Sequence, residues 1–256
     1  MTLLEIRHME EDTAHWVKRA YEAIYTGPGI RQLESFYLWL LDILSPLPGR
    51  RLLDVSCGEG TLVRWASARG VEAYGIDLAE AAVRIAYNRG GLMTGKSSFA
   101  VAAGEHLPFP DVSFDYVTNI GSLEHFADVA AGVREMARIL RPNGTALMLV
   151  PNLFSLLHNV YEVWRKGHVV DDGQPLQRYA TRRDWEQLLR ANGLTVLRTV
   201  KYEREWPRSR SDLAWYLRHP KALVRLMLSP VVPLNLASCF VFLCCRDSTG
   251  DGEGGV

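Results

Sequence analysis

Short apolar runs alternate with amphipathic helical patterns along the middle of the chain. Such alternation is typical of parallel β-strands joined by crossover helices, because both faces of the sheet are then covered. The pattern therefore predicts a doubly wound α/β fold. Expected strands before residue 151 are 51–54, Val71–Ile76, Ser98–Ala102, Phe114–Asn119 and Thr145–Val150.

Later expected strands lie at Leu194–Lys201 and Ser238–Arg246, and they complete a Rossmann-like sheet of seven mostly parallel strands. Amphipathic helices before the first strand form an N-terminal helical cover. Helical insertions follow the fifth and sixth strands. The expected helices are Glu10–Tyr25 and Gln32–Leu44 in the cover, Asn152–Lys166 and Ser211–Leu228 in the insertions, and Val129–Leu140 and Thr181–Ala191 elsewhere.

The first expected strand leads into a turn that suits a nucleotide. Gly58 and Gly60 let the backbone turn sharply and approach a ligand, because neither has a Cβ atom. Asp54, inside the strand, offers a carboxylate to a cationic or polar ligand. A dinucleotide fingerprint would place a third glycine where this chain has Val63. The turn therefore disfavours a dinucleotide.

A second carboxylate, Asp77, stands at the end of the second expected strand. A carboxylate at this point can accept hydrogen bonds from both hydroxyl groups of a ribose. We expect Asp77→Ala to weaken ligand binding at least tenfold, with little effect on the stability of the free protein. We also expect Gly60→Val to block the ligand sterically.

The motifs LLDVSCGEG, GIDLAE, LPFPDVSFD and EMARILRPNGTALMLVPN resemble those of the class I S-adenosylmethionine-dependent methyltransferases, in particular the small-molecule enzymes of the ubiquinone and menaquinone biosynthesis group. The resemblance runs from about Arg50 to Val150 and more loosely to Arg246. It implies S-adenosylmethionine as cofactor, with Asp54 at its methionine end and Asp77 at its ribose. The cofactor-binding residues that it implies are Asp54, Ser56, Cys57, Gly58, Gly60, Asp77, Leu78, Gly104, Glu105 and Asn119.

The chain departs from this family's pattern at two positions. The family commonly has glycine where this chain has Ser56, which would bring the loop closer to the ligand. It often has aspartate where this chain has Ala103, to bind the adenine amino group. Glu105 or a backbone carbonyl could take over that contact.

Length and composition fit one catalytic domain. The chain has 256 residues, of which 48% are hydrophobic, and 29 basic residues balance 29 acidic ones. Because the net charge is zero, electrostatics does not favour a nucleic-acid partner. We expect a single methyltransferase domain over 1–246, with the cover at 1–49, the cofactor-binding core at 50–150 and the substrate-side insertions and last strands at 151–246. A flexible tail is expected at 247–256.

The four cysteines lack metal-binding spacing, so no metal site is expected. They are interpreted as thiols buried in the core of a protein from a reducing compartment. The sequence shows neither the apolar segment of a signal peptide nor an apolar run long enough for a transmembrane helix. We therefore expect a cytoplasmic protein. The segment Leu213–Leu236 is apolar, has basic residues and is broken by prolines. It is expected to form a lid, which could also contact a membrane surface peripherally.

The acceptor is expected where strand order reverses, at the carboxyl ends of the fourth and fifth strands. His125 is the best candidate for a general base, because it directly follows the fourth strand and histidine titrates near neutral pH. It would equally suit a hydrogen bond to loop backbone. Tyr21 and Tyr25 belong to an aromatic group that is mostly core, of which one or two could cap the sulfonium. The acceptor-site candidates are Asn119, Gly121, Glu124, His125, Asn152, His158 and the loop His168–Tyr179, including Tyr179.

Three functions remain open at this point. The first is an S-adenosylmethionine-dependent methyltransferase that acts on a small-molecule or lipid-like acceptor by direct displacement. The second is a catalytically inactive cofactor-binding partner subunit. The third is a nicotinamide-dependent oxidoreductase, which Val63 opposes. Binding of S-adenosylmethionine or NADH separates the last from the others, and methyl transfer from labelled cofactor separates the first from the second.

Overall fold

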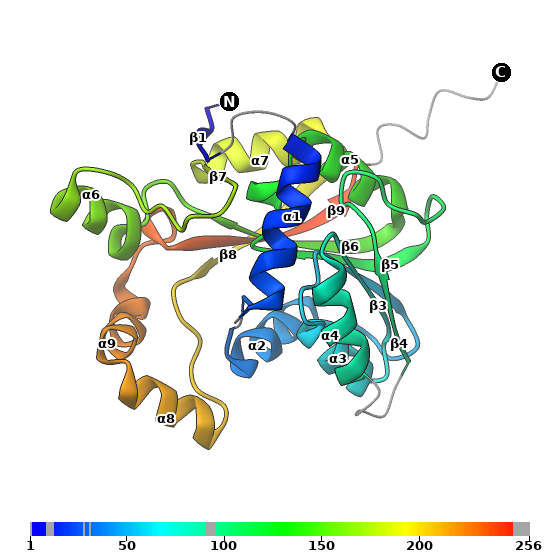
Figure 1. Cartoon of the computed structure of the whole chain (residues 1–256), viewed down its shortest axis with the longest axis horizontal. Helices are drawn as coiled ribbons and strands as arrows, with labels where there is room; N and C mark the ends of the chain where they lie inside the picture. The colour runs from blue at the N-terminus through cyan, green and yellow to red at the C-terminus, as the bar shows by residue number, and fades with distance from the viewer. Residues whose placement is uncertain (1, 9–12, 28, 31, 91–95, 248–256) are drawn as a thin grey trace.

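The structure is a computed structural model that describes residues 2–8, 13–27, 29–30, 32–90 and 96–247. Within this part of the chain the main sheet has seven strands, which confirms the predicted fold (Figure 1). Chain order reverses at β2, which lies between β3 and β5. The strands run in the order β4 (Ser97–Val101), β3 (Glu72–Asp77), β2 (Arg51–Val55), β5 (Phe114–Ile120), β6 (Leu140–Pro151), β9 (Cys239–Arg246) and β8 (Leu194–Tyr202).

One strand breaks the parallel pattern. Strands β4, β3, β2, β5 and β6 pair in parallel, whereas β9 pairs antiparallel with both β6 and β8. The sheet is therefore mostly parallel, as predicted. The carboxyl ends of β2 and β5 therefore lie side by side at the reversal point, which is where such sheets bind ligands.

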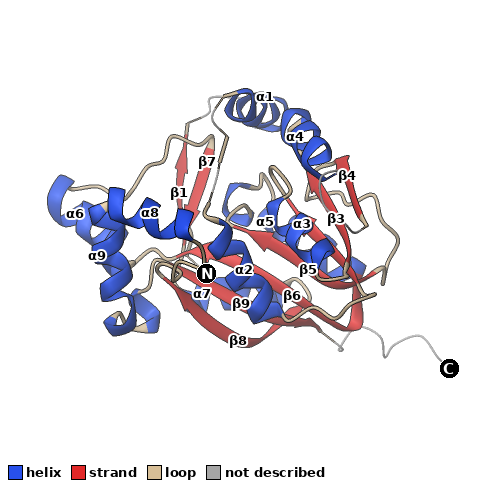
Figure 2. Cartoon of the chain, turned by 90° about the horizontal axis from the view of Figure 1, so that it is seen from below, coloured by secondary structure: helices blue, strands red, loops and turns tan. Residues whose placement is uncertain are grey.

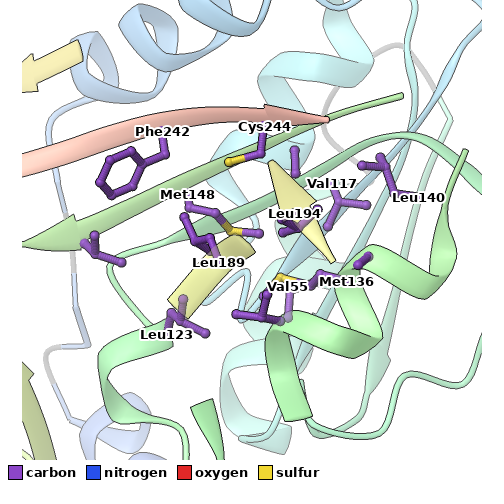
Figure 3. Close-up of a cluster of buried hydrophobic side chains, with 14 of the residues drawn as sticks. Val55, Val117, Leu123, Met136, Leu140, Met148, Leu189, Leu194, Phe242 and Cys244 are labelled. Carbon is purple, nitrogen blue, oxygen red and sulfur yellow. The ribbon is translucent and has the colours of Figure 1, made fainter. Parts of the chain in front are cut away.

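Two hydrophobic cores lie on opposite faces of the sheet, because successive strand residues point to opposite sides. In β9, Phe240 and Phe242 enter one core and Val241 and Leu243 enter the other. Figure 3 shows part of the first core, with Phe242 above Met148 and Leu189. The first core also packs against α5 (Val129–Ile139) and α7 (Arg182–Ala191), and the second against α2 (Glu34–Leu44) and α3 (Thr61–Ala68).

The N-terminal cover lies over the cofactor side of the sheet. Helix α1 (Thr13–Thr26) crosses the centre of the view in Figure 1 and contacts α4 (Glu80–Gly90). The side chain of Glu22 accepts a hydrogen bond from the Ala81 N–H at 3.0 Å, which ties α1 to the first turn of α4. Part of the helix expected from Glu10 lies outside the described residues, as does the expected tail after Asp247.

A small second sheet was not predicted. Strand β1 (Leu4–Arg7) pairs antiparallel with β7 (Leu176–Tyr179), so the stretch His168–Tyr179 is only partly a loop. Four-residue strands carry too little alternation to be distinguished from loop in the sequence. Figure 2 shows the two strands side by side, apart from the main sheet.

Three other elements differ from the expected ones. β6 begins at Leu140 and takes in the expected turn at 141–144, with a register shift opposite β5. The helix expected from Asn152 begins at Leu156, as a π-helical turn (Leu156–Val160) that continues into α6 (Tyr161–Lys166). The helix expected at Ser211–Leu228 is two helices, α8 (Arg210–Arg218) and α9 (Pro220–Leu228), because Pro220 cannot continue the first.

Candidate active site

The turn after β2 has a left-handed backbone at Ser56 (φ 63°), Gly58 (φ 52°) and Gly60 (φ 70°). Glycine adopts such angles easily and serine rarely does, so Ser56 stands at a position that favours glycine. A Cβ added to Gly58 would lie 2.7 Å from the Tyr25 hydroxyl oxygen. Helix α1 therefore packs directly on the turn.

Gly60 serves a different purpose from the one expected. A Cβ added there would lie 2.6 Å from Phe99 Cε1 and 2.9 Å from Ala86 Cβ. The conflict is with the protein's own side chains, so Gly60 allows β2, β4 and α4 to pack closely. The expectation that Gly60→Val acts by blocking the ligand is therefore corrected.

Asp77 joins the ends of β2 and β3. Its Oδ2 accepts a hydrogen bond from the Gly58 N–H at 2.8 Å, and its Oδ1 accepts one from the Ala79 N–H at 2.9 Å. Burial raises the pKa of Asp77, and the backbone hydrogen bonds oppose that shift. A carboxylate has about four lone-pair sites. Asp77 can therefore accept further hydrogen bonds from a ligand without releasing the turn.

A cavity of about 360 Å³ lies beneath α1 and beside Asp77. Glu105 Oε1 accepts a hydrogen bond from the Ala127 N–H at 2.9 Å, which braces one wall. Tyr21 and Tyr25 of α1 cover the cavity. The expected cofactor residues that line it are Ser56, Asp77, Leu78, Gly104 and Glu105.

A second cavity, of about 480 Å³, shares Ser56 and Tyr25 with the first and reaches Asp54, Cys57 and Gly58. Asp54 is buried in β2, and its Oδ1 accepts a hydrogen bond from the Thr118 hydroxyl at 2.7 Å. Burial raises the pKa of Asp54 to about 7. It also raises the pKa of the Cys57 thiol, so this cysteine is not a reactive thiolate.

Asn119 is fully buried and lines neither of these cavities. Its Nδ2 donates to the Val55 carbonyl at 3.2 Å, and its Oδ1 accepts from the Leu123 N–H at 2.8 Å. The side chain thus ties the end of β2 to the short 3-10 turn Leu123–His125. Its predicted contact with the cofactor stays a prediction.

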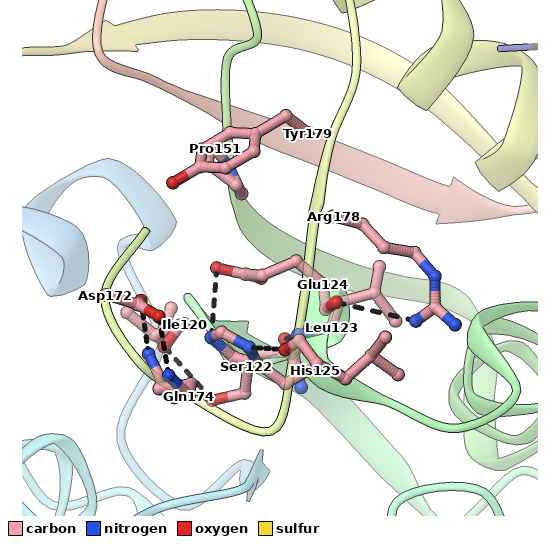
Figure 4. Close-up of polar contacts among 12 residues, drawn as sticks. Ile120, Ser122, Leu123, Glu124, His125, Pro151, Asp172, Gln174, Arg178 and Tyr179 are labelled. Carbon is pink, nitrogen blue, oxygen red and sulfur yellow. Dashed lines mark hydrogen bonds and ion pairs between the residues drawn. The ribbon is translucent and has the colours of Figure 1, made fainter. Parts of the chain in front are cut away.

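His125 borders both cavities and is held by backbone (Figure 4). Its Nδ1 is hydrogen-bonded to the Leu176 carbonyl oxygen. A carbonyl only accepts, so Nδ1 carries the proton and Nε2 keeps a lone pair in the neutral ring. Burial lowers the pKa of His125, although the Leu176 hydrogen bond opposes the shift.

Two buried polar atoms near His125 have no hydrogen-bond partner among the residues that the structure describes. They are Oε2 of Glu124 and Oε1 of Gln177, and both residues line the second cavity. The other carboxylate oxygen of Glu124 lies 3.9 Å from His125 Nε2. Burial raises the pKa of Glu124 to about 8, and the nearby charge of Asp172 adds to the effect. Unpartnered buried groups of this kind often mark a ligand site.

Of the remaining acceptor candidates, some line a cavity and others form hydrogen bonds that hold the backbone in place. Gly121 borders both cavities and His158 lines the second, where burial lowers its pKa to about 4. Asn152 donates to the carbonyls of Asn235 and Ala237, at 2.9 and 2.8 Å. The Tyr179 hydroxyl donates to the Val170 carbonyl at 3.0 Å. Asn152 and Tyr179 therefore serve as framework in this conformation.

Sequence reasoning missed several lining residues. Tyr202 and Cys239 come from the facing ends of β8 and β9, whereas Gln177 belongs to the predicted stretch His168–Tyr179 and lies in the unpredicted strand β7. Arg64 of α3 also lines the second cavity, and its Nε has no partner. No local motif marks these positions, because only the assembled sheet brings them together. Within the described residues, no group of three His, Cys, Asp or Glu side chains is placed to hold a metal ion.

The fold and these two cavities define a doubly wound α/β protein with room for a ligand at the carboxyl ends of its strands, and comparisons with known proteins specify its class. A family model described as a methyltransferase domain matches residues 53–148. The ubiquinone biosynthesis O-methyltransferase of Alkalilimnicola ehrlichii is 31% identical over 180 residues, which cover 64% of this chain and 67% of that protein. The nocamycin O-methyltransferase of Saccharothrix syringae is 38% identical over 47% of this chain and 45% of its own length.

Solved structures agree on the fold. An S-adenosylmethionine-dependent methyltransferase from Mesorhizobium loti superposes with a TM-score of 0.60 at 17% identity, over 83% of this chain and 98% of that one. The chain belongs to the class I S-adenosylmethionine-dependent methyltransferases. Its cofactor is S-adenosylmethionine.

The residues present fit this cofactor. Asp77 retains lone pairs toward the first cavity, whose lining of Leu78 and Gly104 leaves room for a flat base. Asp54 and the turn at Gly58 adjoin the second cavity, where an ammonium group can meet a carboxylate. Both ends of the cofactor thus have suitable partners.

Proposed function

We propose that this enzyme methylates a hydroxyl oxygen of a small acceptor, with His125 as the general base. The observation that carries the proposal is the hydrogen bond between His125 Nδ1 and the Leu176 carbonyl. This bond leaves Nε2 as the proton acceptor, at the boundary of the two cavities. The lowered pKa of His125 keeps the ring neutral near pH 7, as a base requires.

S-adenosylmethionine, when bound, supplies a methyl group on a positively charged sulfur. Asp77, Leu78 and Gly104 would hold its nucleoside, and Asp54 its amino group. His125 would take the hydroxyl proton on Nε2 as the acceptor oxygen becomes nucleophilic. Methyl transfer is a displacement in one step, so alignment of acceptor and cofactor supplies much of the rate.

Glu124 is proposed to orient the acceptor. With a pKa of about 8, its carboxyl group is largely protonated at neutral pH and can donate a hydrogen bond. Gln177 offers a carbonyl oxygen that no protein group uses. Together they would bind polar groups of the acceptor beside the hydroxyl that His125 deprotonates. His158 and Tyr202 would close the far wall.

The acceptor class is inferred from the relatives. The two O-methyltransferases named above make oxygen the favoured atom. A lipid-like acceptor, a cytoplasmic location with peripheral membrane contact through 213–236, and the absence of a nucleic-acid partner belong to the same proposal. They are supported by the exposed apolar residues of that segment and the balanced net charge.

The test is methyl transfer from isotopically labelled cofactor into fractionated extracts of phenols, alcohols and isoprenoid lipids. Labelled methyl ethers, identified by mass spectrometry and NMR, are the expected products. The variant His125→Gln should lose at least a hundredfold in rate while binding the cofactor normally. Products labelled at carbon or nitrogen would contradict oxygen methylation.

A further inference from the structure

An unusual number of large apolar side chains are exposed at one end of the molecule. The indole of Trp164 in α6 is 81% exposed, and Leu217 in α8 is 66% exposed. A soluble surface rarely gathers such residues unless they meet a partner. We define the apolar end as the exposed residues Phe154, Val160, Tyr161, Val163, Trp164, Leu213, Leu217, Val224, Met227, Leu228 and Val231.

Most of these residues belong to three short helices, α6, α8 and α9, and the others flank those helices. Figures 1 and 2 both place α6, α8 and α9 at the end of the molecule opposite β4. Helix α9 follows α8 directly, after a break at Pro220. No helix in the described part of the chain is long and apolar enough to cross a bilayer. The apolar end can therefore lie on a membrane but not span it through these helices.

Basic residues border the apolar end. Arg165, Arg210, Arg218 and Lys221 are exposed, and no ion pair is found for them among the described residues. The chain as a whole has no net charge, so this local excess of cations is distinctive. Exposed apolar and aromatic side chains flanked by unpaired Lys and Arg are typical of interfacial helices on anionic lipids.

The segments that carry the apolar end begin and end at residues of the acceptor cavity. His158, in the π-helical turn before α6, lines that cavity. Tyr202 and Cys239 line it as well, and they lie before and after the segment that carries α8 and α9. The apolar end is therefore tied to the cavity through the backbone on which it stands.

We propose that the apolar end docks on the surface of an anionic phospholipid bilayer and receives the acceptor from it. This inference rests on the proposed function, which it extends by naming the partner and by adding α6 to the segment 213–236. A second copy of the chain is a poorer partner, because a symmetric contact would bring the unpaired cations against one another.

Vesicle flotation tests the docking without cofactor or acceptor. The intact chain should rise with vesicles of phosphatidylcholine and phosphatidylglycerol at low salt, and less with phosphatidylcholine alone. The variant Leu217→Glu should lower the partition coefficient at least tenfold, and so should Trp164→Glu. The matched control is Leu197→Glu in β8, which is 65% exposed but lies outside the apolar end and should bind as the parent does.

Two outcomes would overturn the proposal. One is a parent protein that stays at the bottom of the gradient with both vesicles at low salt. The other is a parent dimer, seen by light scattering, that Leu217→Glu converts to a monomer without any change in vesicle binding. Calorimetric cofactor binding and methyl transfer to a water-soluble acceptor are measured separately. Both would persist if only the docking were wrong, whereas methyl transfer to oxygen alone would fail if the proposed function were wrong.

Discussion

The carboxylate of Asp77 accepts a hydrogen bond from the backbone N–H of Gly58 at 2.8 Å. One side chain thus sets the shape of the cofactor turn and also faces the cavity in which a ribose would lie. Structure and binding are therefore coupled at this residue. A substitution that disturbs ligand binding here must also disturb the free protein.

This coupling changes the expected outcome of substituting Asp77. Asp77→Ala would leave the buried N–H groups of Gly58 and Ala79 without a partner, each at a cost of about 1–3 kcal/mol. The free protein should therefore be destabilised, contrary to the expectation from sequence. The milder Asp77→Asn should bind cofactor at least tenfold more weakly and unfold at a lower denaturant concentration. Calorimetry and urea titration measure both effects, with the exposed Asp111→Asn as control.

Replacing the proposed base should affect rate and pH dependence but not cofactor affinity. His125→Gln should lower kcat about 10²–10⁴-fold. In the parent, kcat/KM should fall as the pH drops below the pKa of His125, which burial places below its usual 6.5. This fall in kcat/KM at low pH should be absent in His125→Gln. It should persist in the control His219→Gln, because His219 is exposed and lies outside the cavities. A parent midpoint above 6.5 would argue against a buried neutral base.

The buried acids should make the free enzyme less stable as the pH rises. In the unfolded chain Asp54 and Glu124 ionise near pH 4, whereas in the fold their pKa values are about 7 and 8. The folded state therefore binds more protons between these limits, and its stability declines with rising pH through them. Melting temperatures from pH 5 to 9 should show the decline, and Glu124→Gln should reduce it. If melting temperature falls with pH as steeply in Glu124→Gln as in the exposed control Glu80→Gln, the raised pKa of Glu124 is refuted.

Even a small side chain at Gly60 should destabilise the fold. Gly60→Ala places a Cβ 2.6 Å from Phe99 and imposes a left-handed backbone on alanine, at a total cost of roughly 2–4 kcal/mol. Trimming the opposing ring in Phe99→Leu should recover part of this loss. A double-mutant cycle by denaturant unfolding measures the coupling. Additive effects of the two substitutions would show that the ring is not the obstacle.

The main sheet could be predicted from sequence because each of its strands is a buried apolar run between helical patterns. Val117 and Met148 are examples, because both are apolar residues that enter the same core from neighbouring strands. The small sheet could not be predicted in this way. Its strands are four residues long, and the residue opposite Leu4 is Tyr179, far away in the chain.

The candidate site shows a similar division. Asp54, Asp77 and His125 could be proposed because each lies at or near the carboxyl end of a strand, and topology brings those ends together. Tyr202 and Cys239 could not, because they meet only once β8 and β9 are paired. The roles of Asn119 and Asn152 depend on which backbone groups lie within hydrogen-bond reach, and sequence spacing does not specify that.

The pairing of β1 with β7 has a practical consequence for handling the enzyme. Arg7 lies opposite Leu176, and the Leu176 carbonyl fixes the proton on His125. The first residues of the chain thus help to set the protonation geometry of a site assembled more than a hundred residues later. An affinity tag or a truncation that displaces residues 4–7 would lower the measured rate of methyl transfer. The loss would look like a defect in catalysis, although every residue that lines the cavities is intact.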